Sequence, residues 1–262
     1  MTTRICLAGA TGWTGVPLSA AIAAADDLEL VAAVSRSRRG ERLDGAAGVT
    51  ISGSVAEALE VASDVFVDYT SATAVKEHVI AAVNAGRHCV VGSSGLSDDD
   101  YAELDALARE RGVGVIAVGN FAIAAALLHR FAAEAAQYLP SWEIIDYAND
   151  AKVDQPSGTA RELAWRLAQS GTPSTAVPLE ESVGPRAARG TIVNGTHIHS
   201  VRLPGYVIGV EALFGRDDQR LSIRYEGGTS ATAYIDGTLL AIRRAHEFTG
   251  LVRGMDALLG GA

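Results

Sequence analysis

The chain has 262 residues, of which 48% are hydrophobic and 20% are charged. A chain of this length and composition can bury a sizeable core in one large or two modest domains, which excludes a disordered protein. Its formal net charge of -9 disfavours a nucleic-acid-binding surface, so an anionic ligand would have to bind at a local basic cluster.

No apolar run approaches the roughly 18–20 residues that a membrane span requires, and the chain enters a strand directly after its first residues. We therefore expect a cytoplasmic protein without a membrane partner. The two cysteines, Cys6 and Cys89, lie within apolar runs, which predicts buried thiols rather than a disulfide or a metal pair.

The first half of the chain alternates short apolar runs with helical patterns. Strands are expected at residues 4–10, 28–34, 65–70, 88–94 and 113–119, and helices at Trp13–Ala25, Ser54–Ala62, Ala74–Ala85 and Asp98–Arg111. Continuous apolar strands that alternate with helices are typical of a parallel sheet covered on both faces. This pattern predicts an α/β fold with a Rossmann-type, doubly wound parallel sheet in the N-terminal domain.

The second half of the chain has a different pattern. Helices are expected at Ala122–Tyr138, from Ala160 onward and at Gly237–His246, and strands at 142–148, 197–203, 205–215 and 219–227. Turn signals between the last strands favour a mixed or antiparallel sheet, and hence a second α+β domain. We predict a first domain at 1–121, completed by 238–262, and a second domain at 122–237.

A glycine-rich loop, Gly9-Ala10-Thr11-Gly12-Trp13-Thr14-Gly15, joins the first expected strand to the first helix. Glycines at this place allow a tight turn, a close approach of the backbone to a pyrophosphate, and close packing of helix and strand. The loop therefore indicates a dinucleotide site in the first domain; a tight turn without a ligand is the alternative. The candidate cofactor-binding residues are Gly9, Thr11, Gly12, Trp13, Thr14 and Gly15.

The end of the second expected strand indicates which dinucleotide binds. An NAD site usually has an acidic residue there, whereas this chain reads Val34-Ser35-Arg36-Ser37-Arg38-Arg39 with no carboxylate before Glu41. Hydroxyl and guanidinium groups suit a 2′-phosphate, so Ser35 and Arg36 are candidate cofactor-binding residues and NADPH is expected rather than NADH. A solvated basic loop is the alternative interpretation.

Three further loops follow expected strand ends, which is where ligands of open α/β sheets bind. Their backbone groups and small side chains would let a flat nicotinamide ring approach. The candidate residues are Tyr69, Thr70, Gly92, Ser93, Ser94, Gly119, Asn120 and Phe121.

The segment Lys152–Ala160, which reads KVDQPSGTA, places a cation beside a helix start. Pro156 favours that start, and Ser157, Gly158 and Thr159 then offer backbone N–H groups and two hydroxyls. The helix dipole and the Lys152 ammonium both favour a bound carboxylate. A capped helix beside a solvated lysine is the alternative.

Together these motifs resemble the 4-hydroxy-tetrahydrodipicolinate (dihydrodipicolinate) reductase family over nearly the whole chain. VDYT matches the family's (I/V)DFT, VVGSSGL its VVGTTG, VGNFAI its APNFAIG and KVDQPSGTA its KxDAPSGTA. The resemblance implies NAD(P)H use, hydride transfer to a cyclic, unsaturated imino dicarboxylate, and a homotetramer, or a homodimer, built through the second-domain sheet. It also implies that Lys152, Ser157, Gly158 and Thr159 hold a substrate carboxylate, so the second domain is the substrate-binding and oligomerisation domain.

The chain departs from the family where substrate is bound. The family has the run EXHHxHK, whose first histidine is its proposed proton donor, whereas this chain reads DYANDAK over 146–152, with Ala148 and Asn149 at the first two histidine positions. A further family histidine falls at Ile208 or Gly209, and a family arginine falls at Ala231. These losses predict an altered specificity, with Asn149 limited to hydrogen bonding.

Several residues are candidates for the proton donor. Lys152 comes first, because it lies beside the predicted anion site, and Tyr147 comes second. Tyr234, His197 and His199 are further candidates; the two histidines alternate on one strand face without an evident third ligand, so no metal site is predicted.

The sequence thus predicts an NADPH-dependent reductase that transfers hydride to a C=N or conjugated C=C bond of a small, cyclic, carboxylate-bearing substrate. Two alternatives stay open. One is the authentic reductase of lysine and diaminopimelate biosynthesis with a substitute proton donor. The other is a catalytically silent, NADPH-binding regulatory homologue.

Overall fold

The computed structural model describes residues 2–46 and 48–260. The chain forms two units: the first runs to Ile123 and resumes at Ser230, and the second comprises Ala124–Thr229. The return to the first unit comes several residues before the predicted position at 238. The reason is that η3 (Ala231–Tyr234) packs against α1 (Gly15–Ala23) and α7 (Ile235–Arg244), which both belong to the first unit.

The first unit is built on a seven-stranded parallel sheet of order β12-β6-β5-β4-β1-β2-β3. Its strands are β1 (Thr3–Ala8), β2 (Leu28–Val34), β3 (Ile51–Ser52), β4 (Val65–Asp68), β5 (His88–Val91), β6 (Gly114–Ala117) and β12 (Gly250–Arg253). The predicted Rossmann-type parallel sheet is confirmed. The edge strands β3 and β12 were not predicted, because neither lies in an apolar run as long as those around the central strands.

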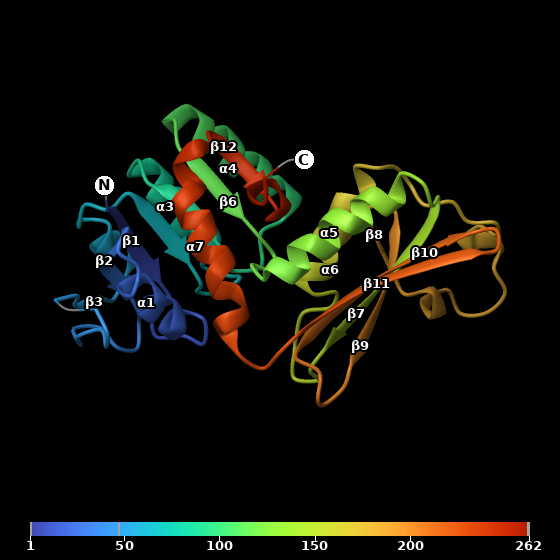
Figure 1. Cartoon of the computed structure of the whole chain (residues 1–262), viewed down its shortest axis with the longest axis horizontal. Helices are drawn as coiled ribbons and strands as arrows, with labels where there is room; N and C mark the ends of the chain where they lie inside the picture. The colour runs from blue at the N-terminus through green and yellow to red at the C-terminus, as the bar shows by residue number, and fades with distance from the viewer. Residues whose placement is uncertain (1, 47, 261–262) are drawn as a thin grey trace. The chain divides into compact units, whose positions relative to one another are not determined.

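Helices cover both faces of this sheet. Figure 1 shows α1 beside α7 in front of the sheet, with α3 (Val75–Asn84) and α4 (Asp98–Arg111) behind it, and the same helices make contacts in these pairs. A continuous core of buried residues joins α3 and α4 to the sheet, among them Phe66, Val79 and Leu104. The helix expected at Ser54–Ala62 is shorter, since α2 spans Val55–Ala58. The backbone N–H groups of Glu60 and Val61 donate to the carbonyl oxygens three residues before them, which ends the α-helical pattern.

The second unit is a five-stranded mixed sheet of order β11-β10-β7-β9-β8 with two helices. The strands are β7 (Ser141–Ala148), β8 (Thr191–Val193), β9 (Thr196–Arg202), β10 (Ile208–Arg216) and β11 (Gln219–Gly227), and the helices are α5 (Ile123–Ala136) and α6 (Gly158–Ala168). Only the β7–β9 pair is parallel among the described strands of this sheet. The predicted α+β unit is therefore confirmed, and its parallel pair makes the sheet mixed.

Strand β7 has two faces of different character. Trp142, Ile144, Asp146 and Ala148 are buried, whereas the residues between them are only half-buried. Helix α6 packs against β7, β8 and β9, and a contact of 3.2 Å between buried His129 and Glu162 joins α5 to α6. Because side chains alternate along a strand, the even-numbered residues of β7 share the face that α6 covers.

Short 3-10 helices complete the chain at Leu179–Glu181, Arg186–Arg189, Ala245–Glu247 and Asp256–Leu258. Cys6 and Cys89 are free and buried, as predicted, and burial raises the pKa of the Cys6 thiol to about 12. Within the described chain, no helix has the length and apolar character needed to cross a membrane.

Candidate active site

The first unit contains a cavity of about 580 Å³ at the carboxyl ends of its central strands. This volume is within the range of small-molecule and cofactor sites. Seven of the predicted cofactor-binding residues line the cavity: Gly9, Thr11, Gly12, Ser35, Arg36, Tyr69 and Thr70. The structure therefore brings together the glycine loop, the end of β2 and the end of β4, which is the set of elements that a dinucleotide requires.

The glycine loop needs its glycines for packing as well as for an approaching ligand. Gly9 has a φ of 85°, and a Cβ atom on it would lie 2.2 Å from the carbonyl oxygen of Tyr69. A Cβ on Gly15 would lie 2.0 Å from the carbonyl oxygen of Gly9. The loop is thus held tightly against the end of β4, and α1 begins directly behind it at Gly15.

The three arginines after β2 are not equivalent. The Arg38 Nε atom lies 2.8 Å from Glu41 Oε2, and Arg39 pairs with Glu57 at 3.4 Å. Arg36 lines the cavity, is exposed, and forms no ion pair within the described chain. Arg36 is therefore the arginine whose charge stays available to a ligand.

The floor of the cavity beside Arg36 carries hydroxyl groups. The Thr11 and Ser35 hydroxyl oxygens lie 2.7 Å apart, and Ser35 is buried. This pair links the glycine loop to the end of β2. Hydroxyls and a free guanidinium, without a carboxylate at the end of β2, form a donor set that fits a phosphorylated ribose.

A buried carboxylate, Asp68, organises the loops after β4 and β5. Its Oδ1 atom accepts hydrogen bonds from the Thr70 N–H (3.0 Å), the Thr70 hydroxyl (2.8 Å) and the Ser93 hydroxyl (2.6 Å). Its Oδ2 atom lies 2.9 Å from Nδ1 of His78 on α3. Burial opposes ionisation of Asp68, but these hydrogen bonds together hold its pKa below the usual value.

Asp68 and His78 were not selected as site residues from the sequence. Asp68 lies in the VDYT motif, directly before Tyr69 and Thr70, so its position at a strand end was visible. His78 carried no such signal, because it lies in the middle of a helix and only the fold brings it to the cavity.

The remaining predicted cofactor-binding residues lie around the loops rather than in the cavity wall. A Cβ on Gly92 would lie 2.2 Å from the Tyr69 ring, so this glycine makes room for the tyrosine. The Tyr69 hydroxyl lies 2.6 Å from the Thr238 hydroxyl, and burial raises the pKa of Tyr69. Phe121 is buried with its ring centroid 6.0 Å from that of Tyr69. These rings fix the shape of the loops.

The other positions in this group are more varied. Asn120 is buried and accepts a hydrogen bond from the Ala122 N–H, while Gly119 and Ser94 are exposed. Thr14 is buried and precedes α1. Trp13 is exposed and packs edge-on against Tyr234, with ring centroids 5.7 Å apart. Tyr234, a proton-donor candidate from the sequence, is therefore a neighbour of the glycine loop.

In the second unit, the predicted anion site is a helix start that already has an internal carboxylate. The Ser157 N–H donates to Asp146 Oδ2 at 2.8 Å, and the Ser157 hydroxyl accepts from the Ala160 N–H. Ser157 and Thr159 are buried and Gly158 is partly exposed. Asp146 thus takes one of the N–H groups that we expected an external carboxylate to use, and Gly158 and Thr159 begin the helix beyond it.

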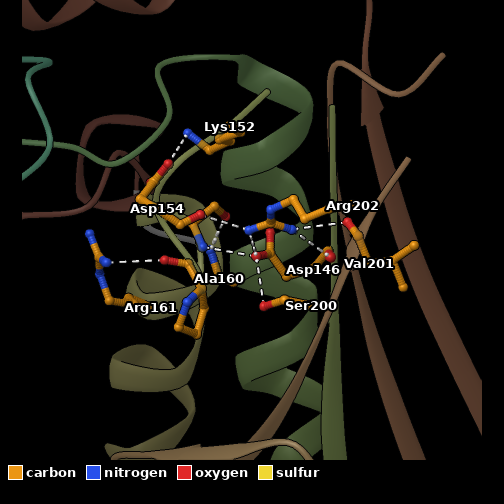
Figure 2. A network of polar contacts seen from close by, with 10 residues as sticks. Asp146, Lys152, Asp154, Ala160, Arg161, Ser200, Val201 and Arg202 are labelled. Carbon is orange, nitrogen blue, oxygen red and sulfur yellow. Dashed lines mark hydrogen bonds and ion pairs between the residues drawn. The ribbon is translucent and has the colours of Figure 1, made fainter. Parts of the chain in front are cut away.

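Asp146 is held by Arg202, which comes from the end of β9. The Arg202 Nη2 atom donates to Asp146 Oδ2 at 2.7 Å and to the carbonyl oxygen of Asp154 at 2.8 Å. Ser200 also donates to Asp146 Oδ2, at 3.3 Å. Figure 2 shows Arg202 and Ser200 converging on Asp146, beside Ala160 in the first turn of α6. Because Asp146 is fully buried, the pair fixes the start of α6 to β7 and β9.

Lys152 and Asn149 lie in the loop before this helix. The Lys152 Nζ atom lies 2.7 Å from Asp154 Oδ1. Figure 2 marks this contact with a dashed line. Asn149 uses its side-chain oxygen to accept from the Ala151 N–H and its backbone oxygen to accept from the Lys152 N–H. Asn149 therefore shapes the turn that presents Lys152.

Tyr147 lies on the other face of β7. Its hydroxyl donates to Glu211 Oε2 at 2.9 Å, and the Arg224 guanidinium lies 4.4 Å from the ring centroid. His197 and His199 share that face: His199 Nε2 lies 2.7 Å from Glu143 Oε2, and His197 Nδ1 lies 2.7 Å from the Arg189 carbonyl oxygen. The structure thus separates Tyr147 and both histidines from Lys152 and Ser157. The described residues contain no group of three side chains suited to a metal ion.

The departures from the family pattern form a row across the sheet. Ile208 pairs with Ala148, and Ala148 pairs with Arg202, so the three positions lie side by side on β10, β7 and β9. Gly209 pairs with Tyr147 instead. Of the two positions left open for the missing histidine, only Ile208 lies on the face of Ala148 and α6. Ala231 lies in the first unit, where it is buried in η3.

The chain matches two family models that together span most of its length. The N-terminal dihydrodipicolinate reductase model matches residues 3–121, and the C-terminal dihydrodipicolinate reductase model matches residues 124–259. The chain belongs to the dihydrodipicolinate reductase family. It is therefore an NAD(P)H-dependent oxidoreductase by family membership.

Curated relatives agree with this assignment. The chain is 38% identical over 262 residues to the 4-hydroxy-tetrahydrodipicolinate reductase of Syntrophomonas wolfei, with 98% of each chain covered. It is 38% identical over 265 residues to the enzyme of the same name from Moorella thermoacetica, again with 98% of each chain covered.

Among solved structures, the dipicolinate-bound dihydrodipicolinate reductase from Paenisporosarcina sp. TG-14 is similar, with a TM-score of 0.77 and 29% identity. The match covers 98% of this chain and 99% of that one. An amine dehydrogenase from Mycobacterium smegmatis shares the fold alone, at 16% identity and a TM-score of 0.65.

Proposed function

We propose that this member of the dihydrodipicolinate reductase family is an NADPH-dependent reductase with altered specificity. Its substrate would be a small, cyclic carboxylate with a reducible C=N or conjugated C=C bond. The observation that carries the proposal is the contrast between the two sites. The cofactor cavity keeps its glycine loop and a free arginine, whereas Ala148 and Ile208 replace imidazole groups in one row of the second unit.

Each part of the chain has a separate task in this proposal. A bound reduced nicotinamide would supply the hydride. In the first unit, Gly9 and Gly12 let the backbone approach a pyrophosphate, and Thr11, Ser35 and Arg36 bind the ribose and its 2′-phosphate. In the second unit, the start of α6 at Gly158 and Thr159 binds a substrate carboxylate with Lys152.

Lys152 is the proton donor that we propose, because it is a cation in the loop directly before the helix start and is not tied to the opposite face of β7. Its ammonium can donate a proton to the atom next to the reduced carbon. The contact with Asp154 keeps the ammonium beside the helix start. A positioned donor contributes about 10²–10⁴-fold to a proton transfer.

Cofactor preference gives the first prediction. NADPH should bind more tightly than NADH by about tenfold or more, since a hydrogen bond to a charged group contributes about 1.5–3 kcal/mol. Arg36→Asp should narrow or reverse the ratio of the two dissociation constants, measured by calorimetry. Arg38→Asp is the matched control, because Arg38 pairs with Glu41 and should leave the ratio close to that of the unmodified protein. Equal dissociation constants in the unmodified protein would refute the preference.

The carboxylate site gives the second prediction. A crystal soaked with dipicolinate, the ligand in the similar Paenisporosarcina structure, should show one carboxylate at the Gly158 and Thr159 N–H groups and near Lys152. Lys152→Ala should weaken dipicolinate binding by about tenfold or more, whereas Asp154→Asn, which keeps a side-chain oxygen beside Lys152 and removes a negative charge, should not weaken it. Dipicolinate bound elsewhere, together with unchanged affinity in Lys152→Ala, would contradict the site.

Two alternatives remain distinguishable by experiment. An authentic reductase of lysine biosynthesis would turn over 4-hydroxy-tetrahydrodipicolinate without any substitution. A catalytically silent regulatory homologue would bind NADPH but would not oxidise it in the presence of any cyclic imine. In such a protein the intact Lys152–Thr159 segment would have no function. The predicted cytoplasmic location and the homotetramer, or homodimer, stay predictions.

A further inference from the structure

The second unit contains a cavity of about 310 Å³ that has no part in the proposed reaction. It lies where β7 begins, β10 ends and β11 begins. The candidate carboxylate site follows the other end of β7. A strand rises about 3.3 Å per residue, so the ends of β7 at Ser141 and Ala148 are roughly 20 Å apart. The cavity is therefore separate from the candidate substrate site.

Two rows of paired strand residues line the cavity from the face of the sheet that α6 does not cover. The members of each row pair across neighbouring strands and so share one face of the sheet. The outer row is Ser141, Gly215 and Arg220, and the next row is Leu213, Glu143 and His197. Residues 173–175, which follow α6, also line the cavity.

The cavity has one positive charge that no other group balances. The acidic side chain among its described lining residues is Glu143, whose Oε1 atom contacts the Arg189 guanidinium and whose Oε2 atom lies 2.7 Å from His199 Nε2. The Arg220 side chain is exposed and forms no hydrogen bond or ion pair with any residue that the structure describes. A guanidinium stays charged and matches the geometry of a carboxylate. Arg220 therefore favours an anionic ligand at this cavity.

Contacts within the second unit hold the walls of the cavity in place. The Ser141 and Ser174 hydroxyl oxygens lie 2.9 Å apart, which links the start of β7 to the segment after α6. The His197 Nδ1 atom lies 2.7 Å from the carbonyl oxygen of Arg189, and since a carbonyl oxygen can only accept, the ring donates this hydrogen bond. Walls that are fixed before binding reduce the conformational freedom lost when a ligand enters.

The remaining lining residues suit a small apolar group. Leu213 and Pro173 provide apolar side chains, and Gly195 and Gly215 leave space where other residues would have side chains. The volume admits a single substituted ring rather than a dinucleotide. A second carboxylate on such a ligand would meet the charge of Glu143, because like charges repel.

We propose that this cavity is an accessory binding site for a small monocarboxylate with an apolar ring. The carboxylate pairs with Arg220, and the ring lies against Leu213 and Pro173. One carboxylate balances the one unpaired cation. The site requires neither a nucleotide nor the Lys152–Thr159 segment, so the inference is independent of the proposed function.

Benzoate and its neutral analogue benzamide test the charge pairing. Calorimetry should show that benzoate binds about tenfold or more tightly than benzamide, because only benzoate forms a charged contact. Arg220→Gln should remove this difference. Arg216→Gln is the matched control, since Arg216 is an exposed arginine of the same hairpin that does not line the cavity. Lys152→Ala should leave benzoate binding unchanged, which separates this cavity from the candidate substrate site.

A second variant tests the cavity itself. Gly215 pairs with Arg220, and a Cβ atom on Gly215 would meet no heavy atom within 4 Å. Gly215→Val should therefore unfold at the temperature of the unmodified protein and exclude both benzoate and benzamide. Benzoate affinity that is unchanged in Arg220→Gln, or no benzoate binding by the unmodified protein, would overturn the proposal. A changed sedimentation coefficient in either variant would also overturn it, because a second copy of the chain would then cover the cavity.

Discussion

Replacing Arg202 by Met should lower the free energy of unfolding of the second unit by about 3–5 kcal/mol. Removing one partner of a buried ion pair leaves the other charge buried without compensation, which has this cost. Here the remaining charge would be Asp146, whose side chain is fully buried, and Arg202 itself is only 12% exposed. The start of α6 would lose its link to β9, so binding of a substrate carboxylate should weaken at the same time.

Tryptophan fluorescence can report this unfolding selectively. Two of the three tryptophans, Trp142 and Trp165, lie in the second unit, and Trp13→Phe removes the third. In that background, Arg189→Met is a control for the loss of an exposed ion pair in the same unit, since Arg189 is 46% exposed and pairs with Glu143. Loss of this exposed pair should lower the free energy of unfolding by less than about 1 kcal/mol. An Arg202→Met variant no less stable than this control would show that the buried network contributes little.

The second large effect concerns the substrate. The unmodified protein should turn over 4-hydroxy-tetrahydrodipicolinate with NADPH only negligibly, because no imidazole lies in the row of Ile208, Ala148 and Arg202. Histidine at 148 and 149 should raise that activity by about 10²–10⁴-fold, the usual contribution of a positioned proton donor. Steady-state rates of NADPH oxidation measure the change.

The structure refines the design of this experiment. Ala148 is fully buried and Ile208 lies directly across from it, so Ile208→Ala should be added to make room for the new ring. Tyr147→His is the matched control, since it adds an imidazole to the opposite face of the same strand. This variant should not raise the turnover of 4-hydroxy-tetrahydrodipicolinate. If the unmodified protein already turns over this substrate at about 10 s⁻¹ or more, the middle of the enzyme range, its specificity has not changed.

Local patterns were sufficient to predict much of this molecule. The buried strands of the first unit could be predicted because both faces of the sheet are covered and the strands are continuously apolar. The strand at 142–148 could be predicted because apolar and more polar residues alternate along it. The glycine loop and the PSGT helix start were also predictable, because both depend on backbone geometry that few residues permit. The short strands β3, β8 and β12 were not predicted, since none of them lies in an apolar run as long as those around the equally short strands β4, β5 and β6.

The contacts inside the sites could not be predicted for a different reason. Asp146 and Arg202 are 56 residues apart in the chain, and Asp68 and Ser93 are 25 residues apart. Nothing near Ser157 in the sequence indicates that a strand carboxylate takes its N–H group. His78 and Asp68 are closer together, but their link depends on how α3 lies against β4. Such pairings are fixed by tertiary packing, which a single sequence does not display.

The alternation along β7 has a consequence for how this family can change over time. Substitutions at 146 and 148 alter the chemistry beneath α6, whereas those at 145 and 147 alter a surface that contacts β10 side chains such as Glu211. A substitution on one face of β7 therefore leaves the side chains of the opposite face in place. The residues that face α6 and those that face away from it form separate sets within the same eight-residue strand, so each set can change without the other.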